Sequence, residues 1–265
     1  MPNLFRSAAH KDRSELRSDP QAPAADSKDT APCPIYVVIP AAGSGSRMGA
    51  GKNKQFLEVG GMPLIVRTLL AFERAARITG YILVTAPDDV DEMNNLIRNF
   101  DLKKIISLAD GGSSRQESVL LGLRKLRALR PDVTEAIALV HDGARCFIST
   151  PIINRCVDTI LERHCACGVA VPLKDTIKLT AANGKIEKTI DRSRLWAMQT
   201  PQGAFFNDLH QAYEHLAQTG EAVTDDLAAM EAAGYETYLV EGDYANIKMT
   251  TPEDLVIGEA LAVTY

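Results

Sequence analysis

The sequence contains no run of about 20 apolar residues, the length that a helix needs to span a bilayer, so we expect no membrane segment. It also lacks an excess of positive charge. Its 29 Lys and Arg residues are outnumbered by 34 Asp and Glu residues, which gives a formal net charge of −5. A general nucleic-acid surface is therefore not expected, because such surfaces are strongly basic.

The five cysteines do not form a disulfide framework. They lie among apolar residues, as at Cys146 and Cys156, which favours a reducing compartment, and we expect a cytoplasmic protein. The segment from His164 to Cys167 contains metal-binding residue types, but a structural zinc site needs about four spaced ligands and no second cluster follows. We interpret this segment as the end of a helix that runs into a strand.

Two familiar glycine motifs are missing from the loop that follows residues 37–39. A dinucleotide fingerprint needs a third Gly or Ala where the chain has Met48, and an acidic residue about 20 positions later, where residues 63–70 contain none. A P-loop needs a glycine and a hydroxyl where the chain has Ser46 and Asn53. Both motifs are excluded.

The same loop does carry the features of a phosphate site. It follows an apolar β-branched run, contains Gly43 and Gly45, and carries the cations Arg47, Lys52 and Lys54. Glycines allow the backbone N–H groups to approach a phosphate closely, and the cations add charge. An ordinary glycine-rich turn is the alternative, but the spacing of Arg47 and Lys54 resembles the signature loop of sugar-phosphate nucleotidyltransferases.

Residues 1–33 differ in composition from the rest of the chain. They are rich in Ser, Asp, Ala and Pro, show no hydrophobic period, and contain balanced charges. Such a segment buries too little apolar surface to offset its ordering entropy, so we expect a disordered N-terminal tail. Residues 34–265 are expected to form one catalytic domain.

Short β-branched runs alternate with longer helical patterns in that domain. We expect buried strands at residues 35–39, 81–85, 105–108, 136–140, 168–171 and 237–240, and helices at residues 63–76, 115–130, 151–163 and 203–217. Helices are also expected after the caps at 224–226 and 251–254. The alternation predicts a Rossmann-like α/β fold, with a mostly parallel sheet and helices on both faces.

One segment interrupts the alternation. Residues 176–179 and 185–190 show a period of two around Asn183 and Gly184, the sequence typical of a hairpin with a type I′ turn. We expect this hairpin to belong to a projecting arm over about residues 173–196. Its edges and apolar residues need a cover, and a partner subunit would supply one.

Three further segments carry candidate chemistry. Residues 110–118 follow a strand and open a helix, so backbone groups and Ser118 can face a flat polar base, although a plain strand–helix turn has the same pattern. Asp142 ends the next strand beside the phosphate loop, where a carboxylate suits Mg²⁺. His141 is interpreted as a core histidine. Lys248 is expected at the same sheet edge as Lys54.

In this order and spacing, the motifs resemble those of the 2-C-methyl-D-erythritol 4-phosphate cytidylyltransferases of the non-mevalonate isoprenoid pathway, from about residue 35 to the C-terminus. Two small departures stand out. Asn53 replaces a proline that is usual before Lys-Gln, and residues 143–146 read Gly-Ala-Arg-Cys in place of Ala-Ala-Arg-Pro. The matching stretches are residues 40–48, 54–56, 111–118, 141–145, 175–178, 191–196, 199–202, 224–226 and 246–248.

The resemblance implies a reaction in which a polyol phosphate attacks the α-phosphorus of CTP in line and pyrophosphate leaves. It implies a homodimer in which the arm reaches the partner's site. It also implies catalytic roles for Arg47, Lys54 and Lys248, a divalent cation beside Asp142, and substrate contacts from Ala41, Ala42, Gly43, Gly45, Gly111, Gly112, Ser118, Asp142, Arg145, Thr176 and Arg192.

Two alternatives stay open at this point. A cytidylyltransferase for another polyol phosphate, such as ribitol 5-phosphate, looks alike across the nucleotide loop. The stretch from Leu195 to Gln202 favours methylerythritol phosphate. A non-catalytic nucleotide-binding module would be expected to lose a reactive group, whereas Arg47, Lys54, Asp142 and Lys248 are all present.

Overall fold

The computed structural model describes residues 33–43 and 53–264. The expected tail, apart from Cys33, therefore lies outside the described residues, as do Gly45 and Arg47 of the phosphate loop. Within the described ranges, no helix combines the length and the apolar character that a membrane crossing requires.

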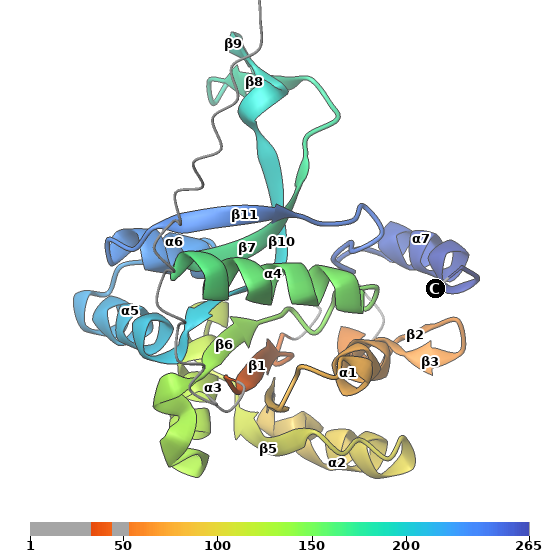
Figure 1. Ribbon diagram of the computed structural model, residues 1–265. Helices are drawn as coiled ribbons and strands as arrows, with labels where there is room; N and C mark the ends of the chain where they lie inside the picture. Colours follow the sequence, from red (N-terminus) through yellow and green to blue (C-terminus); the bar gives the residue numbers. More distant parts are fainter. Residues whose placement is uncertain (1–32, 44–52, 265) are drawn as a thin grey trace, which may run out of the picture. The chain divides into compact units, whose positions relative to one another are not determined.

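A seven-stranded sheet runs through the domain (Figure 1) in the order β11-β7-β10-β6-β1-β4-β5. Neighbouring strands are parallel, except that β10 is antiparallel to both β6 and β7. This confirms the predicted α/β class. The strands are β1 (Ile35–Pro40), β4 (Gly80–Thr85), β5 (Ile105–Asp110), β6 (Ile137–Val140), β7 (Ala166–Pro172), β10 (Trp196–Phe205) and β11 (Thr237–Glu241).

Strand β10 is the strand of the seven-stranded sheet that the sequence pattern did not predict, and helix α2 (Val90–Asn99) was not predicted either. It is polar at Gln199, Thr200 and Gln202, contains Pro201, and its pairing with β7 shifts register between Met198 and Gln202. A strand is predicted from an alternating or apolar run of residues. Such a run is interrupted by polar residues, by a proline and by an irregular register. Because β10 extends to Phe205, the helix expected from residue 203 begins only at Phe206.

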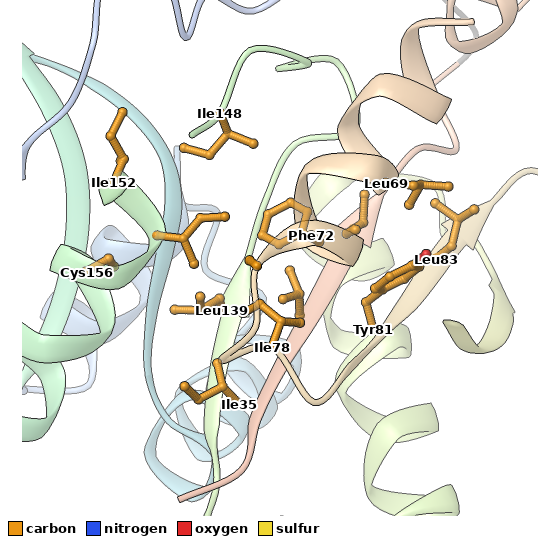
Figure 2. Packing of buried hydrophobic residues seen from close by; sticks show 14 of the residues in the cluster. Ile35, Leu69, Phe72, Ile78, Tyr81, Leu83, Leu139, Ile148, Ile152 and Cys156 are labelled. Carbon is orange, nitrogen blue, oxygen red and sulfur yellow. The ribbon is translucent and has the colours of Figure 1, made fainter. Parts of the chain in front are cut away.

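Helices cover both faces of the sheet, and successive side chains of β1 point into two separate apolar cores, one on each face. Ile35, Val37 and Ile39 pack with α1 (Leu64–Arg74), α2 (Val90–Asn99) and α4 (Thr150–Arg163). Tyr36 and Val38 pack with α3 (Arg115–Leu129), α5 (Phe206–Thr219) and α6 (Asp226–Ala232). Figure 2 shows the first core, with Phe72 of α1 and Ile152 of α4 beside the strands.

Short elements complete the domain. These elements are β2 (Glu58–Val59), β3 (Met62–Pro63), α7 (Pro252–Ala262) and the 3₁₀ turns η2 (Lys54–Phe56), η3 (Pro87–Asp89), η4 (Pro131–Glu135) and η5 (Arg192–Arg194). Helix α7 packs against the rest of the domain through a small apolar cluster. This cluster includes Val59 of β2, Leu64 of α1 and Met249.

Helix ends agree with most of the sequence signals. Thr251 and Asp254 form a capping box on α7, and Asp225 caps α6 by accepting from Ala228 N. His164 ends α4 in the left-handed conformation and β7 starts at Ala166, which confirms the predicted helix–strand junction. Ser149 occupies the N-cap position of α4, but its side chain makes no capping bond.

The hairpin is present as β8 (Ile177–Thr180) and β9 (Ile186–Ile190), and it extends beyond the ends of β7 and β10 (Figure 1). The predicted type I′ turn is wrong, because that turn needs positive φ at both central residues and only Gly184, at φ +82°, has it. Gly184 N donates to Ala181 O, and Asn183 Oδ1 accepts from Lys185 N. The loop is thus longer than two residues and ends in a left-handed glycine.

The strand order places one sheet edge where a ligand site is expected. The chain runs from β1 to β4 and β5 on one side, and then continues with β6 on the other side of β1. Ligands in open α/β sheets bind at such a switch point, outside the carboxyl ends of the strands. Pro40, Asp110 and Asp142 all lie at or just after those ends.

Candidate active site

A cavity of about 450 Å³ opens at this switch point. Its walls come from five parts of the chain: the turn after β1, the start of η2, the loop between β5 and α3 with the first turn of α3, the turn after β6, and the loop between β11 and α7. The lining residues are Pro40, Ala42, Gly43, Lys54, Gln55, Gly112, Ser113, Ser114, Arg115, Ser118, Asp142, Gly143, Ala144 and Lys248.

The wall between β5 and α3 is held rigid by its own hydrogen bonds. Gly112 N donates to Ser118 Oγ at 3.0 Å, and Ser118 Oγ donates to Ser114 O at 2.8 Å. A Cβ atom at Gly111 would lie 2.2 Å from Ala42 Cβ, so only glycine lets this loop approach the turn after β1. The Ser118 side chain therefore helps to form the wall, and its hydroxyl hydrogen is donated within the loop, to Ser114 O.

Lys54 begins η2, where Asn53 replaces the proline usual in the resembling family. Asn53 has φ −59°, close to the value that a proline ring imposes. Its Oδ1 accepts from Gln55 N at 3.2 Å, and its Nδ2 donates to Asp89 Oδ2 of η3 at 2.5 Å. The side chain of Asn53 thus supplies the local constraint that the missing ring would have given.

Asp142 lies at the floor of the cavity, surrounded by cations. Its Oδ1 accepts from Arg115 Nε at 2.9 Å, and its Oδ2 lies 2.8 Å from Lys248 Nζ and 3.7 Å from Arg145 Nε. Burial opposes ionisation of this carboxyl, but Arg115 and Lys248 outweigh it and hold the Asp142 pKa well below its usual range. Asp142 is therefore an anion at every physiological pH.

A second cavity, of about 300 Å³, lies against the first. It shares Arg115, Asp142 and Lys248 with the first cavity, so these three side chains separate two binding spaces. Its remaining lining residues are Arg145, Met198, Gln199, Thr200, Gln202, Thr224 and Asp225, most of them from β10 and the turn before α6.

His141 braces the site from within the core. It is fully buried, its Nδ1 lies 3.0 Å from Thr200 Oγ1, and its Nε2 lies 3.0 Å from Arg145 O. Burial lowers the pKa of His141 to about 4, although the bond to the Arg145 carbonyl opposes the shift. The ring is neutral at pH 7, which agrees with its interpretation as a core histidine.

The structure gathers most of the predicted site residues at these cavities. Ala42, Gly43, Lys54, Gly112, Ser118, Asp142 and Lys248 line the first cavity, and Arg145 lines the second. Gly111 lies behind the wall, and Ala41 is buried with its N–H on Val84 O. Thr176 and Arg192 are exposed on the arm and line neither cavity of their own chain.

Two charged residues of the candidate site, Arg115 and Asp226, were not predicted from the sequence. Arg115 is the first residue of α3, where the helix dipole disfavours a cation, and this local conflict is a signal of a specific partner. Asp226 was interpreted only as a first-turn acid, yet it is fully buried and forms a two-point ion pair with Arg115. Nothing in the local sequence of Asp226 indicates this pairing.

Two cavities that share three charged side chains, at the switch point of a mostly parallel sheet, are the arrangement expected of an α/β protein that binds a nucleotide beside a second ligand. Comparison with known proteins narrows the class. A family model described as 2-C-methyl-D-erythritol 4-phosphate cytidylyltransferase (IspD) matches residues 35–263, and the chain belongs to this family.

Individual relatives agree. A protein of Geobacillus kaustophilus with that name is 46% identical over 225 residues, which cover 84% of this chain and 95% of the relative. Its namesake in Trichormus variabilis is 43% identical over 226 residues, covering 85% and 96%. The crystal structure of 4-diphosphocytidyl-2C-methyl-D-erythritol synthase from Anaerococcus prevotii superposes with a TM-score of 0.75 at 30% identity, covering 86% of this chain and 96% of that one.

Proposed function

We propose that this chain transfers the cytidylyl group of CTP to 2-C-methyl-D-erythritol 4-phosphate, giving 4-diphosphocytidyl-2-C-methyl-D-erythritol and pyrophosphate. Family membership over residues 35–263 supports the substrates. The observation that carries the proposal is the pair of cavities that meet at Arg115, Asp142 and Lys248. The nucleotide occupies the cavity beside the glycine turn, and the polyol phosphate occupies the cavity beside β10.

The reaction needs positioning and positive charge more than it needs a base. A phosphate oxygen of the acceptor attacks the α-phosphorus of CTP, and the bond from that phosphorus to the leaving pyrophosphate breaks. The attacking phosphate is already an anion, so no proton has to be removed. Lys54 and Lys248 line the nucleotide cavity and stabilise the charge that grows on the transferring group, together with Arg47.

Asp142 orders the cations by pairing with Lys248 and Arg115. Among the described residues no three potential metal ligands gather, and Asp142 is the one carboxylate that lines the first cavity. A single carboxylate suits Mg²⁺, which takes most of its ligands from substrate phosphates and water. We place a divalent cation beside Asp142, where it would neutralise charge on the triphosphate.

The base is read at the wall that contains Gly112 and Ser118, with Gly111 directly behind it. The hydrogen bonds within this wall fix its backbone, which is what a site needs to distinguish the amine of cytosine from the carbonyl of uracil. Ala41, Ala42, Gly43 and Gly45 bring the turn after β1 against the nucleotide.

The arm completes the site of a second subunit. Leu179 and Ile186 on the hairpin and Trp196 at its base are 51%, 57% and 38% exposed, so this segment carries apolar surface that no other part of the described residues covers. Thr176 and Arg192 lie on the same arm, away from their own cavities, and would reach the acceptor phosphate of the partner. The five unpaired cysteines support a reducing, cytoplasmic setting for this homodimer.

The proposal is tested by initial rates of pyrophosphate release from CTP, with 2-C-methyl-D-erythritol 4-phosphate or ribitol 5-phosphate as acceptor, in Mg²⁺ and in EDTA. We expect rapid release with the first acceptor, in Mg²⁺ only. A higher kcat/KM for ribitol 5-phosphate would assign the chain to the alternative acceptor. No release with either acceptor would contradict the proposed activity.

A further inference from the structure

Arg115 lies between two carboxylates, and only one of them faces a cavity. Its Nε lies 2.9 Å from Asp142 Oδ1, while its Nη1 and Nη2 lie 3.0 and 2.7 Å from the two oxygens of Asp226. Asp226 begins α6, is fully buried, and lines neither of the two catalytic cavities. The hydrogen bonds that join its side chain to the site are those with the guanidinium group.

Tyr213 of α5 completes the surroundings of Asp226. Its hydroxyl donates to Asp226 Oδ1 at 2.5 Å, and the residue is 1% exposed. Removing a carboxylate from water is costly unless it is paired and hydrogen-bonded. Asp226 meets both conditions, with a two-point bond from Arg115 and a third bond from Tyr213.

The two hydrogen bonds to Asp226 fix the orientation of the Arg115 side chain. A guanidinium group is planar and presents its donors as a rigid fork, so occupying both Nη atoms on Asp226 determines where Nε points. Nε points at Asp142, whose other oxygen holds Lys248 Nζ at 2.8 Å. A line of contacts thus runs from α5 through α6 and α3 to the boundary between the two cavities.

We propose that Asp226 and Tyr213 are positioning residues for the transfer reaction. They hold Arg115 in the orientation that presents Nε to Asp142, and so fix the Asp142 carboxylate and the Lys248 ammonium between the nucleotide and the acceptor. The inference rests on the proposed function, because transfer is the reaction that this geometry serves.

Two conservative variants test it. Asp226→Asn keeps the shape of the side chain and removes its charge, and Tyr213→Phe removes one hydrogen bond. We expect kcat per CTP-binding site to fall about 10- to 100-fold in the first and about 5-fold in the second. Calorimetry with CTP counts the folded sites, and the Kd for CTP should change by less than about 3-fold, because neither residue lines the nucleotide cavity.

The chain supplies a matched control in Glu214, the neighbour of Tyr213. Glu214 accepts two bonds from Arg124, at 2.8 and 2.6 Å, so it joins α5 to α3 by a two-point ion pair, as Asp226 joins α6 to α3. Neither residue lines a catalytic cavity. Glu214→Gln should leave kcat unchanged, whereas a general weakening of the α3–α5 contact would lower it as much as Asp226→Asn does.

A second comparison tests whether Asp226 acts through Arg115. In an Arg115→Met background, adding Asp226→Asn should not lower kcat further, since coupled residues show non-additive effects. An independent further loss, or wild-type kcat per site in Asp226→Asn, would overturn the inference. If Asp226→Asn binds no CTP, Tyr213→Phe decides, and a kcat equal to that of the wild type overturns the inference. If the wild type itself transfers nothing, the proposed function fails, and this inference with it.

Discussion

Lys248 Nζ lies 2.8 Å from Asp142 Oδ2, which joins the turn after β6 to the loop between β11 and α7. The ion pair forms part of both cavities. In the proposed reaction, this pair would keep an ammonium group at the place where two negatively charged substrates approach each other. The carboxylate would hold the cation in place for the incoming phosphates.

Lys54→Ala should lower kcat by about 10²- to 10³-fold, as expected when one preorganised charge donor is removed from a transition state. Lys54 lines the nucleotide cavity at the start of η2. The exposed Lys125 on α3 offers a control, and Lys125→Ala should retain full activity. Steady-state kinetics and the Tm of both variants check this, and near-normal turnover in Lys54→Ala would refute its role.

CTP should be preferred over UTP by at least about 10² in kcat/KM. Uracil reverses the donor and acceptor pattern of cytosine, and unpaired buried groups are costly. The wall that would read the base is fixed by bonds among Gly112, Ser114 and Ser118. Competition between the two nucleotides at one concentration measures the ratio, and comparable values would contradict base reading at this wall.

His141 should make the protein less stable as pH falls below about 6.5. Its folded pKa of about 4 lies below the ordinary 6.5, so between these values the unfolded chain binds a proton that the folded chain does not. Stability is therefore complete above pH 6.5, and the loss from this group is about 1 kcal/mol between pH 7.5 and 5.5.

Chemical denaturation at these two pH values measures the effect. His141→Gln should lose less stability on acidification than the wild type, and a control change at the exposed His215 should leave the wild-type difference intact. An equal pH dependence in wild type and His141→Gln would show that His141 does not carry the effect.

The fold was largely predictable from sequence because most of its elements repeat a simple period. Apolar β-branched runs predict β1, β4 and β7, and their alternation with helices predicts the parallel sheet. Strand β10 was not predictable, since it is stabilised by its neighbours β6 and β7 and not by a period of its own. Tertiary pairing overrides local pattern at such positions.

The site shows the same division. Asp142 follows closely after β6, and Lys54 and Lys248 lie in the connections that follow β1 and β11, so their convergence follows from the order of the strands. Asp226 contacts Arg115 because α5 packs against both α3 and α6, which is a relation between distant segments. A local motif carries no information about such a contact.

The arm should make the active site a shared one. Mixing Arg192→Ala with Lys54→Ala should restore activity toward one quarter of the wild-type value, because in half of the subunit pairs one site combines an intact Lys54 with an intact Arg192 from the other chain. Subunit exchange is verified by native mass spectrometry. No recovery after full exchange would mean that each site is built within one chain.

Attack by the acceptor phosphate on the α-phosphorus of CTP is the step on which the proposed function depends, and an isotope experiment can follow it. The acceptor is prepared with ¹⁸O in its phosphate, and the products are analysed by ³¹P NMR and mass spectrometry after turnover. We expect all ¹⁸O to stay in the cytidine diphosphate ester, including its bridging oxygen, and pyrophosphate to be unlabelled. Labelled pyrophosphate, or free CDP as a product, would contradict this mechanism.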